Sequence, residues 1–466
     1  MTGQERNYGF MKLSELTAYE LLGEQELKDI HSMGYILRHK KSGARITVIS
    51  NDDENKVFYI GFRTPPEDST GVPHIIEHTV LCGSDKYPVK DPFVELVKGS
   101  LNTFLNAITY PEKTIYPVAS CNNADFQNLM SVYMDAVFHP NIYQHKEIFC
   151  QEGWHYELET IEGELIYNGV VFNEMKGAFS SPEQQMYSKI EKLLLADTPY
   201  KNESGGDPAA IPTLSQERFL DFHRKYYHPS NSYIYLYGDL DMYKELDYID
   251  KEYLSSFDYR EIDSTIAVQT AYEQMKDESC FYSIAENESE ENQTFLTYNM
   301  VVGSSLDKKQ SVAMNILEYA IMDAPGAPLK KALVDAGIGE DVFASFDDGI
   351  RQTIFSIVAR NANMSDKERF VSVIRDTLTD LSGHGEEGKA IDRTSIEAAI
   401  NNFEFKHKEA NFGRFPKGLM MGLDAFNTWL YDDASALEMF KLNEVYNELK
   451  ESLKTGYFEE LIRKYL

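Results

Sequence analysis

Hydrophobic residues recur along this chain with the two-residue period of strands in some segments and the 3.6-residue period of helices in others. Residues 57–64 (VFYIGFRT) and 232–240 (SYIYLYGDL) are rich in β-branched and aromatic side chains and predict strands. Residues 124–138 carry apolar side chains at helical spacing and predict a helix. Because strands and helices alternate without the strict rhythm of parallel βαβ units, the pattern favours an α+β fold.

Turn and capping residues place further elements between these segments. A short helix is predicted from Pro73 to about Gly83, since proline suits the first helical position. A second helix is predicted to begin near Asp91, a natural N-cap. Residues 106–120 alternate as strands do on either side of a Pro-Glu-Lys turn.

The next stretch predicts a hairpin and then a helix. The hairpin turns at Glu162-Gly163 and joins residues 154–159 to residues 164–167. The helix carries VVFNEMKGAF and follows Asn168, which we expect to be its N-cap.

A change of composition divides the chain of 466 residues, a length that suits two large domains or three smaller ones. Residues 258–293 include the acidic stretch that starts at Glu286, and they indicate a linker. The second unit opens with a predicted strand at 294–302, followed by helical patterns near 307–322 and 326–336. The expected organisation is an α+β domain at 1–260, a linker at 261–293 and a second α+β domain at 294–466.

Charge and cysteine content narrow the classes of function. The 75 acidic residues outnumber the 45 basic ones and give a formal net charge of −30, which disfavours binding to nucleic acid or to anionic lipid. No apolar run approaches the ~20 residues of a membrane span, and MTGQERNYGF does not resemble a signal peptide. Four cysteines without a CxxC pair are no disulfide framework, so we expect reduced thiols and a cytoplasmic protein.

The candidate chemistry lies in the pentapeptide His74-Ile75-Ile76-Glu77-His78. On a helix that turns about 100° per residue, both histidines and the glutamate share one arc of about 100°, while the two isoleucines point into a core. Two imidazoles four residues apart can bind one metal ion, and the glutamate beside them is placed to hold a water. Chance alone produces such a pentapeptide in about one sequence of this composition in fifty.

A catalytic zinc usually takes three protein ligands and leaves one position open. Spacing alone leaves several glutamates open as the third ligand. Glu174 is favoured because it lies within an otherwise apolar predicted helix, where an acid either points to solvent or is held by a charge. The candidates are Glu152, Glu157, Glu159, Glu162, Glu164 and Glu174.

Several longer segments resemble the pitrilysin/insulinase superfamily of inverted zinc peptidases. These are GVPHIIEHTVLCGSDKYPVKDPF, GSLNTFLNAITYPEKTIYPVAS and GVVFNEMKGAF. The block from DPF through GSLNTFLNA and the segment GVVFNEMKG are most similar to the presequence-protease branch. The likeness covers most of residues 10–260 and continues more weakly through GAPLKKALVDAGIGEDV at 326–342. It implies two related α/β-sandwich domains that form one half of a clamshell peptidase.

The resemblance also implies roles for individual residues. His74, His78 and Glu174 would bind zinc, and Glu77 would be the general base. Some relatives carry another glutamate seven residues before the third ligand, where this chain has a tyrosine at 167. Either of the hairpin glutamates, 162 or 164, would then be a candidate to orient a ligand.

The implied substrate is an extended, unstructured peptide that adds a strand to the sheet edge at Asn106 and Ala107. Such binding relies on main-chain hydrogen bonds and tolerates many peptide sequences. Four apolar residues are candidates for a side-chain pocket, with ordinary core packing as the alternative for each: Phe93, Leu96, Phe104 and Leu105.

In that superfamily presequence proteases join two such halves, so the chain is expected to be an N-terminal half whose partner is a C-terminal half or a second subunit. The leading hypothesis is a zinc endopeptidase that degrades peptides. The alternatives are a non-catalytic assembly subunit and a processing peptidase that makes defined cuts with a partner.

Overall fold

The computed structural model describes residues 16–385 and 390–466. Within these ranges the chain is a mixture of helices and antiparallel sheets, which confirms the predicted α+β class. Residues 1–15, which contain the segment considered as a leader, lie outside the described residues. No helix in the described ranges is both long and apolar enough to cross a membrane.

The larger sheet has eight strands in the order β1-β2-β3-β10-β4-β7-β5, with β6 also paired to β7. Strand β10 runs parallel to β3, and the other pairings are antiparallel. At one end of the sheet β5 and β6 pair with β7 and have no further strand partner among the described residues. The strands are β1 Tyr19–Leu27, β2 Ser32–His39, β3 Arg45–Ser50, β4 Lys56–Arg63, β5 Asn102–Leu105, β6 Ile108–Thr109, β7 Lys113–Ser120 and β10 Ser232–Gly238.

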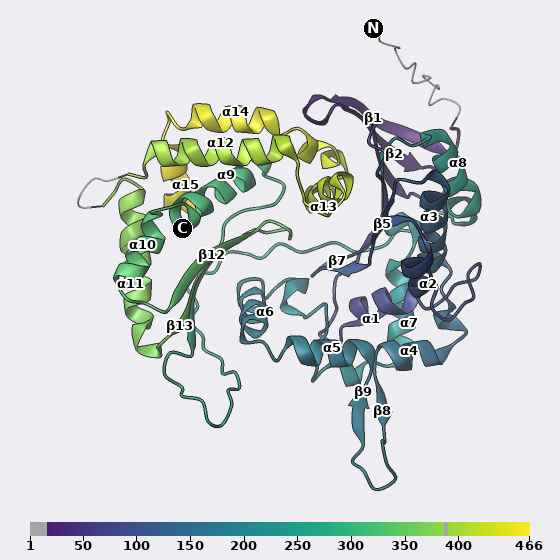
Figure 1. Ribbon diagram of the computed structural model, residues 1–466, viewed down its shortest axis with the longest axis horizontal. Coiled ribbons are helices and arrows are strands. Elements are labelled where there is room, and N and C mark those ends of the chain that lie inside the picture. Colours follow the sequence, from purple (N-terminus) through teal and green to yellow (C-terminus); the bar gives the residue numbers. More distant parts are fainter. Residues whose placement is uncertain (1–15, 386–389) are drawn as a thin grey trace.

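Helices cover both faces of this sheet (Figure 1). One face packs on a core shared with helices early in the chain, and the other packs on α13 from late in the chain. Burial on both faces explains why β4 and β10 have nearly continuous apolar sequences rather than strict alternation. The helices are α1 Val72–Val80, α2 Pro92–Gly99, α3 Asn123–Phe138, α4 Lys146–Glu152, α5 Val170–Ala178, α7 Gln216–Tyr226, α8 Met242–Glu252 and α13 Lys417–Trp429.

The smaller sheet has three antiparallel strands in the order β11-β13-β12. Most helices of the second unit pack on one of its faces, and α6 from the first unit packs on the other. No helix or strand is assigned within residues 258–293, where the linker is predicted. The elements are β11 Thr294–Val301, β12 Asp341–Asp347, β13 Ile354–Ala362, α6 Pro182–Leu194, α9 Lys308–Glu318, α10 Pro328–Asp335, α11 Lys367–Leu381, α12 Arg393–Glu409, α14 Leu442–Ser452 and α15 Tyr457–Tyr465.

Local capping confirms one prediction and corrects another. Asp91 caps α2 by accepting a hydrogen bond from the Val94 N–H at 3.0 Å. The prediction that Asn168 caps α5 is wrong, because Asn168 ends strand β9 (Ile166–Asn168), which pairs with β8 (His155–Glu157). The cap is Gly169, with φ of 149°, and a Cβ there would lie 2.2 Å from the Gly153 carbonyl oxygen.

Candidate metal centre

Helix α1 presents three polar side chains on one face and two isoleucines on the other. Ile75 and Ile76 are fully buried in the core under the large sheet. The rings of His74 and His78 stand edge to face, with their centroids 4.9 Å apart. The helical spacing therefore holds the two imidazoles as a pair.

Each histidine is oriented through its Nδ1 atom. His74 Nδ1 lies 3.0 Å from the Gly205 carbonyl oxygen, and His78 Nδ1 lies 3.3 Å from Glu152 Oε2. With Nδ1 engaged as donor, each ring turns its Nε2 lone pair toward the same space.

Glu174 lies across that space. Its Oε1 is 3.9 Å from His74 Nε2, and its Oε2 is 3.8 Å from His78 Nε2. One ligand atom from each of these three residues falls within 4.8 Å of the other two. Two imidazole nitrogens and one carboxylate oxygen are the donor set of a catalytic zinc site with an open fourth position, so the residues fit that ion.

The N-terminus of α1 is held close to the loop that orients His74. Gly71 has a φ of 69°, and a Cβ there would lie 2.6 Å from Gly206 Cα. Only a residue without a side chain lets the two backbones approach this closely. The Gly205 carbonyl is thereby brought within hydrogen-bond distance of the His74 ring.

Two glutamates, one from α4 and one from α5, lie beside the histidine pair. Glu152 ends α4 and is buried, whereas Glu174 lies on α5 with its side chain about half exposed. The close contact between Gly153 and Gly169 fixes the start of α5 against the end of α4. The packing of these two helices on α1 therefore sets the positions of both carboxylates.

The electrostatics of the site favour a bound cation. Burial acts to lower the pKa of His78, but the hydrogen bond with Glu152 and the surrounding carboxylates outweigh it, so the pKa is raised. Burial acts to raise the pKa of Glu152, but its hydrogen bonds to His78 and Gln151 outweigh that effect and lower it. Both shifts show that positive charge is stabilised between these carboxylates.

Glu77 is nearly buried, and no hydrogen bond joins its carboxylate to another described residue. Its negative charge adds to burial in raising the pKa of Tyr133, so the two groups are close. The Tyr133 hydroxyl donates to the Asn106 carbonyl oxygen at 3.1 Å. Tyr133 thus joins the surroundings of Glu77 to the edge of the large sheet.

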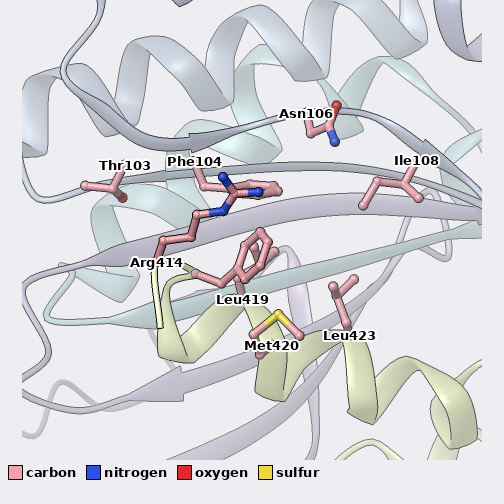
Figure 2. A pocket seen from close by; sticks show the side chains of 9 residues that line it. Thr103, Phe104, Asn106, Ile108, Arg414, Leu419, Met420 and Leu423 are labelled. Atoms are coloured by element: carbon pink, nitrogen blue, oxygen red, sulfur yellow. The ribbon is translucent and has the colours of Figure 1, made fainter. Parts of the chain in front are cut away.

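The edge residues divide between the two faces of the sheet. Leu105 and Ala107 pack against the core on the side of α1, as do Phe93 and Leu96 of α2. Phe104 and Asn106 instead line a pocket of about 530 Å³ between the edge and α13 (Figure 2). Asn106 and Ala107 themselves lie in the short gap between β5 and β6.

The other acids considered from the sequence lie elsewhere. Glu157 bonds to Asn168 within the hairpin, and the remaining three, Glu159, Glu162 and Glu164, are exposed near its tip. Tyr167 belongs to an aromatic cluster with Trp154 and Tyr156 rather than to the metal-site geometry. Glu152 orients His78, whereas the family resemblance had suggested Glu162 or Glu164 for this role.

Two family models match the chain. Residues 57–179 match the model described as Insulinase (Peptidase family M16), and residues 213–403 match Peptidase M16 inactive domain. The first match contains both histidines and all three glutamates of the candidate centre.

Curated relatives match nearly the whole chain. Protein HypA of Clostridium perfringens is 50% identical over 450 residues, which are 97% of this chain and 46% of that protein. Presequence protease 1, chloroplastic/mitochondrial, of Arabidopsis thaliana is 41% identical over 451 residues, which are 96% of this chain and 41% of that protein. The chain therefore spans less than half the length of these relatives.

Solved structures share the fold at low identity. The crystal structure of pitrilysin matches with a TM-score of 0.61 and 16% identity, over 95% of this chain and 46% of that one. A protease from Helicobacter pylori matches with a TM-score of 0.64 and 14% identity, over 93% of this chain and 96% of that one.

Proposed function

Because the chain belongs to the pitrilysin/insulinase superfamily (peptidase family M16), on its presequence-protease-like branch, we propose that it is a zinc-dependent endopeptidase that cuts extended, unstructured peptides. The observation that carries the proposal is the convergence of His74, His78 and Glu174 within 4.8 Å. Glu77 lies on the same helix without a hydrogen-bond partner among the described residues.

The three converging side chains would hold zinc. Zinc bound there would supply Lewis acidity, which polarises a peptide carbonyl and lowers the pKa of water to about 7. Glu152 and the Gly205 carbonyl keep the two imidazoles in the tautomer that leaves Nε2 free.

Glu77 is suited to move the proton. Its carboxylate is shielded from solvent and is not engaged by a neighbouring donor, so it is free to accept a proton from the attacking water. The same carboxyl group can then donate that proton to the leaving amine.

The unpaired edge at β5 and β6 is suited to bind the substrate as an added strand. The Asn106 N–H donates inward to the Pro117 carbonyl at 3.2 Å. Since successive N–H groups of an extended chain point in opposite directions, that of Ala107 would point outward to an arriving peptide. This mode requires an unfolded peptide and imposes little main-chain specificity.

The test is hydrolysis of a quenched, unstructured peptide of about 20–30 residues by the chain alone. Turnover that a chelator abolishes and zinc restores is expected from the wild type, and loss of about 10²-fold to 10⁴-fold from Glu77→Gln with zinc still bound. Glu159→Gln, in the exposed hairpin, is the matched control and should retain full activity. Equal rates for the wild type and Glu77→Gln would refute the assignment of the base.

A second candidate is a subunit that depends on a partner. It is favoured by the coverage of less than half of each curated relative, and by the match of residues 213–403 to the model named for an inactive domain. Zinc binding without turnover, followed by turnover once a chain corresponding to the rest of those relatives is added, would favour it. Mapping the cleavage sites would then separate degradation, with many sites, from processing, with one or two.

A further inference from the structure

The pocket between α13 and the sheet edge lies on the opposite face of the sheet from the metal centre. Its lining comes from two parts of the chain that are distant in sequence (Figure 2). The edge contributes Thr103, Phe104, Asn106 and Ile108, and α13 with the residues just before it contributes Arg414, Phe415, Leu419, Met420 and Leu423.

The alternation of the edge residues links the pocket to a bound peptide. Phe104, Asn106 and Ile108 face the pocket, whereas Leu105 and Ala107 face the core beside α1. A peptide that pairs with this edge has the same two-residue alternation. The side chains of the peptide must therefore point alternately toward the metal-centre face and toward the α13 face.

The chemistry of the pocket is apolar with one cation at its mouth. Phe104 and Phe415 contact each other with ring centroids 6.0 Å apart, and Met420 and Leu423 complete an aliphatic wall. Arg414 is exposed and is the one charged residue among those that line the pocket. No ion pair joins its guanidinium to a described carboxylate, although the chain has 75 acidic residues.

We propose that this pocket is a second specificity site, which selects peptides carrying a bulky apolar side chain on the α13 face and a carboxylate two residues away, on the same face of the peptide strand. The proposal rests on the proposed function, since it requires a peptide strand at the β5–β6 edge. The apolar side chain fills the space between Phe104 and Leu423, and the carboxylate pairs with Arg414. Selection at this site acts on side chains that alternate with those facing the metal centre.

The experiment measures binding rather than turnover, so that it does not depend on cleavage. The zinc-loaded Glu77→Gln protein is titrated with fluorescent unstructured peptides that contain one Phe or Ala and, two residues away, one Glu or Lys. The Phe-Glu peptide is expected to bind about tenfold more tightly than the Ala-Glu peptide, because burying a phenyl ring in an apolar pocket is favourable.

Two added substitutions test the two parts of the pocket. Met420→Trp, at a half-buried wall position, fills the space and should remove the preference for Phe while binding of the Ala peptide is unchanged. Arg414→Glu should reverse the preference between the Glu and Lys peptides. Lys417→Glu makes the same charge change at the start of α13 outside the pocket lining, and should not reverse it.

Two outcomes overturn the proposal and are distinguishable. If Ala107→Pro, which removes an outward N–H at the edge, abolishes peptide binding while Met420→Trp and Arg414→Glu change no preference, the pocket proposal fails and the proposed function stands. If no peptide binds to the zinc-loaded protein, both fail.

Discussion

The two faces of the large sheet meet at the β5–β6 edge but are assembled from different parts of the chain. On one face, two of the three proposed zinc ligands come from α1, the third comes from α5, and Glu152, which bonds to His78, comes from α4. On the other face, the pocket joins residues 103–108 to residues 414–423. The reactive groups are thus concentrated in short motifs, whereas the surface that would select a peptide depends on contacts between two segments that lie far apart in the sequence.

This difference predicts that substitutions on one face leave the other intact. Glu174→Gln is expected to have the largest effect, because it removes one of the three converging side chains proposed to hold zinc. Zinc affinity should fall more than about 100-fold, beyond the range typical of a group that only orients a ligand. Competition with a chromophoric chelator measures the affinity, and Glu164→Gln in the hairpin is the control. Retention of tight zinc binding by Glu174→Gln would contradict the assignment.

Glu152→Gln should lower zinc affinity less than Glu174→Gln does. The amide can still accept a hydrogen bond from the His78 ring but lacks the negative charge that stabilises it. Zinc affinity is expected to fall about tenfold, at the lower end for groups that orient a ligand. Glu147→Gln, exposed on the same helix, should leave it unchanged. Preference among peptides on the α13 face should be unaffected by either substitution.

The sequence predicted that His74 and His78 lie on one side of a helix, because this information is local. The period of 3.6 residues places His74, Glu77 and His78 on one arc, and the structure shows Ile75 and Ile76 buried behind them. Spacing left six glutamates open; the apolar surroundings of Glu174 in the sequence favoured it, and the family resemblance then singled it out. The strands at 57–64 and 232–240 were also predictable, since both faces of them are buried and their sequences are nearly all apolar or aromatic.

What escaped prediction depends on contacts between distant segments. The Gly205 carbonyl that orients His74 is a backbone group, which carries no side-chain signal. Glu152 was one of six acids, and only the packing of α4 on α1 separates it from the rest. Gly169 replaces Asn168 as the cap of α5 because Gly153 passes too close for a side chain. No sequence motif marks the residues that line the α13 pocket.

Gly422→Ala tests the packing that forms the α13 face. A Cβ at this position would lie 2.4 Å from the Tyr59 hydroxyl and 2.7 Å from the Tyr235 ring, both buried in the sheet. Overpacking of this kind costs about 2 kcal/mol in the free energy of unfolding. Gly177→Ala is the matched helical control, since nothing lies within 4 Å of its Cβ position. Urea unfolding measures the stability of both variants. If the two variants are equally stable, α13 does not pack on the sheet as described.

The smallest expected effect is a loss of stability at low pH that arises from a buried histidine in the core beneath α1. His223 is buried with its Nε2–H donating to the Val137 carbonyl at 3.0 Å and its Nδ1 accepting from the Tyr143 hydroxyl at 2.7 Å. Burial lowers its pKa to about 3, whereas in the unfolded chain it returns to about 6.5. Below pH 6.5 the unfolded state therefore binds the extra proton, so stability falls as the pH falls.

Between pH 7 and 5.5 this single group should account for a loss of about 1 kcal/mol in the free energy of unfolding. Urea unfolding with a chelator present measures it free of any metal contribution, because metal binding is itself pH-dependent. His223→Gln should flatten the pH dependence by that amount, whereas His145→Gln, at an exposed position, should not. An unchanged slope in His223→Gln would show that acid acts elsewhere in the fold.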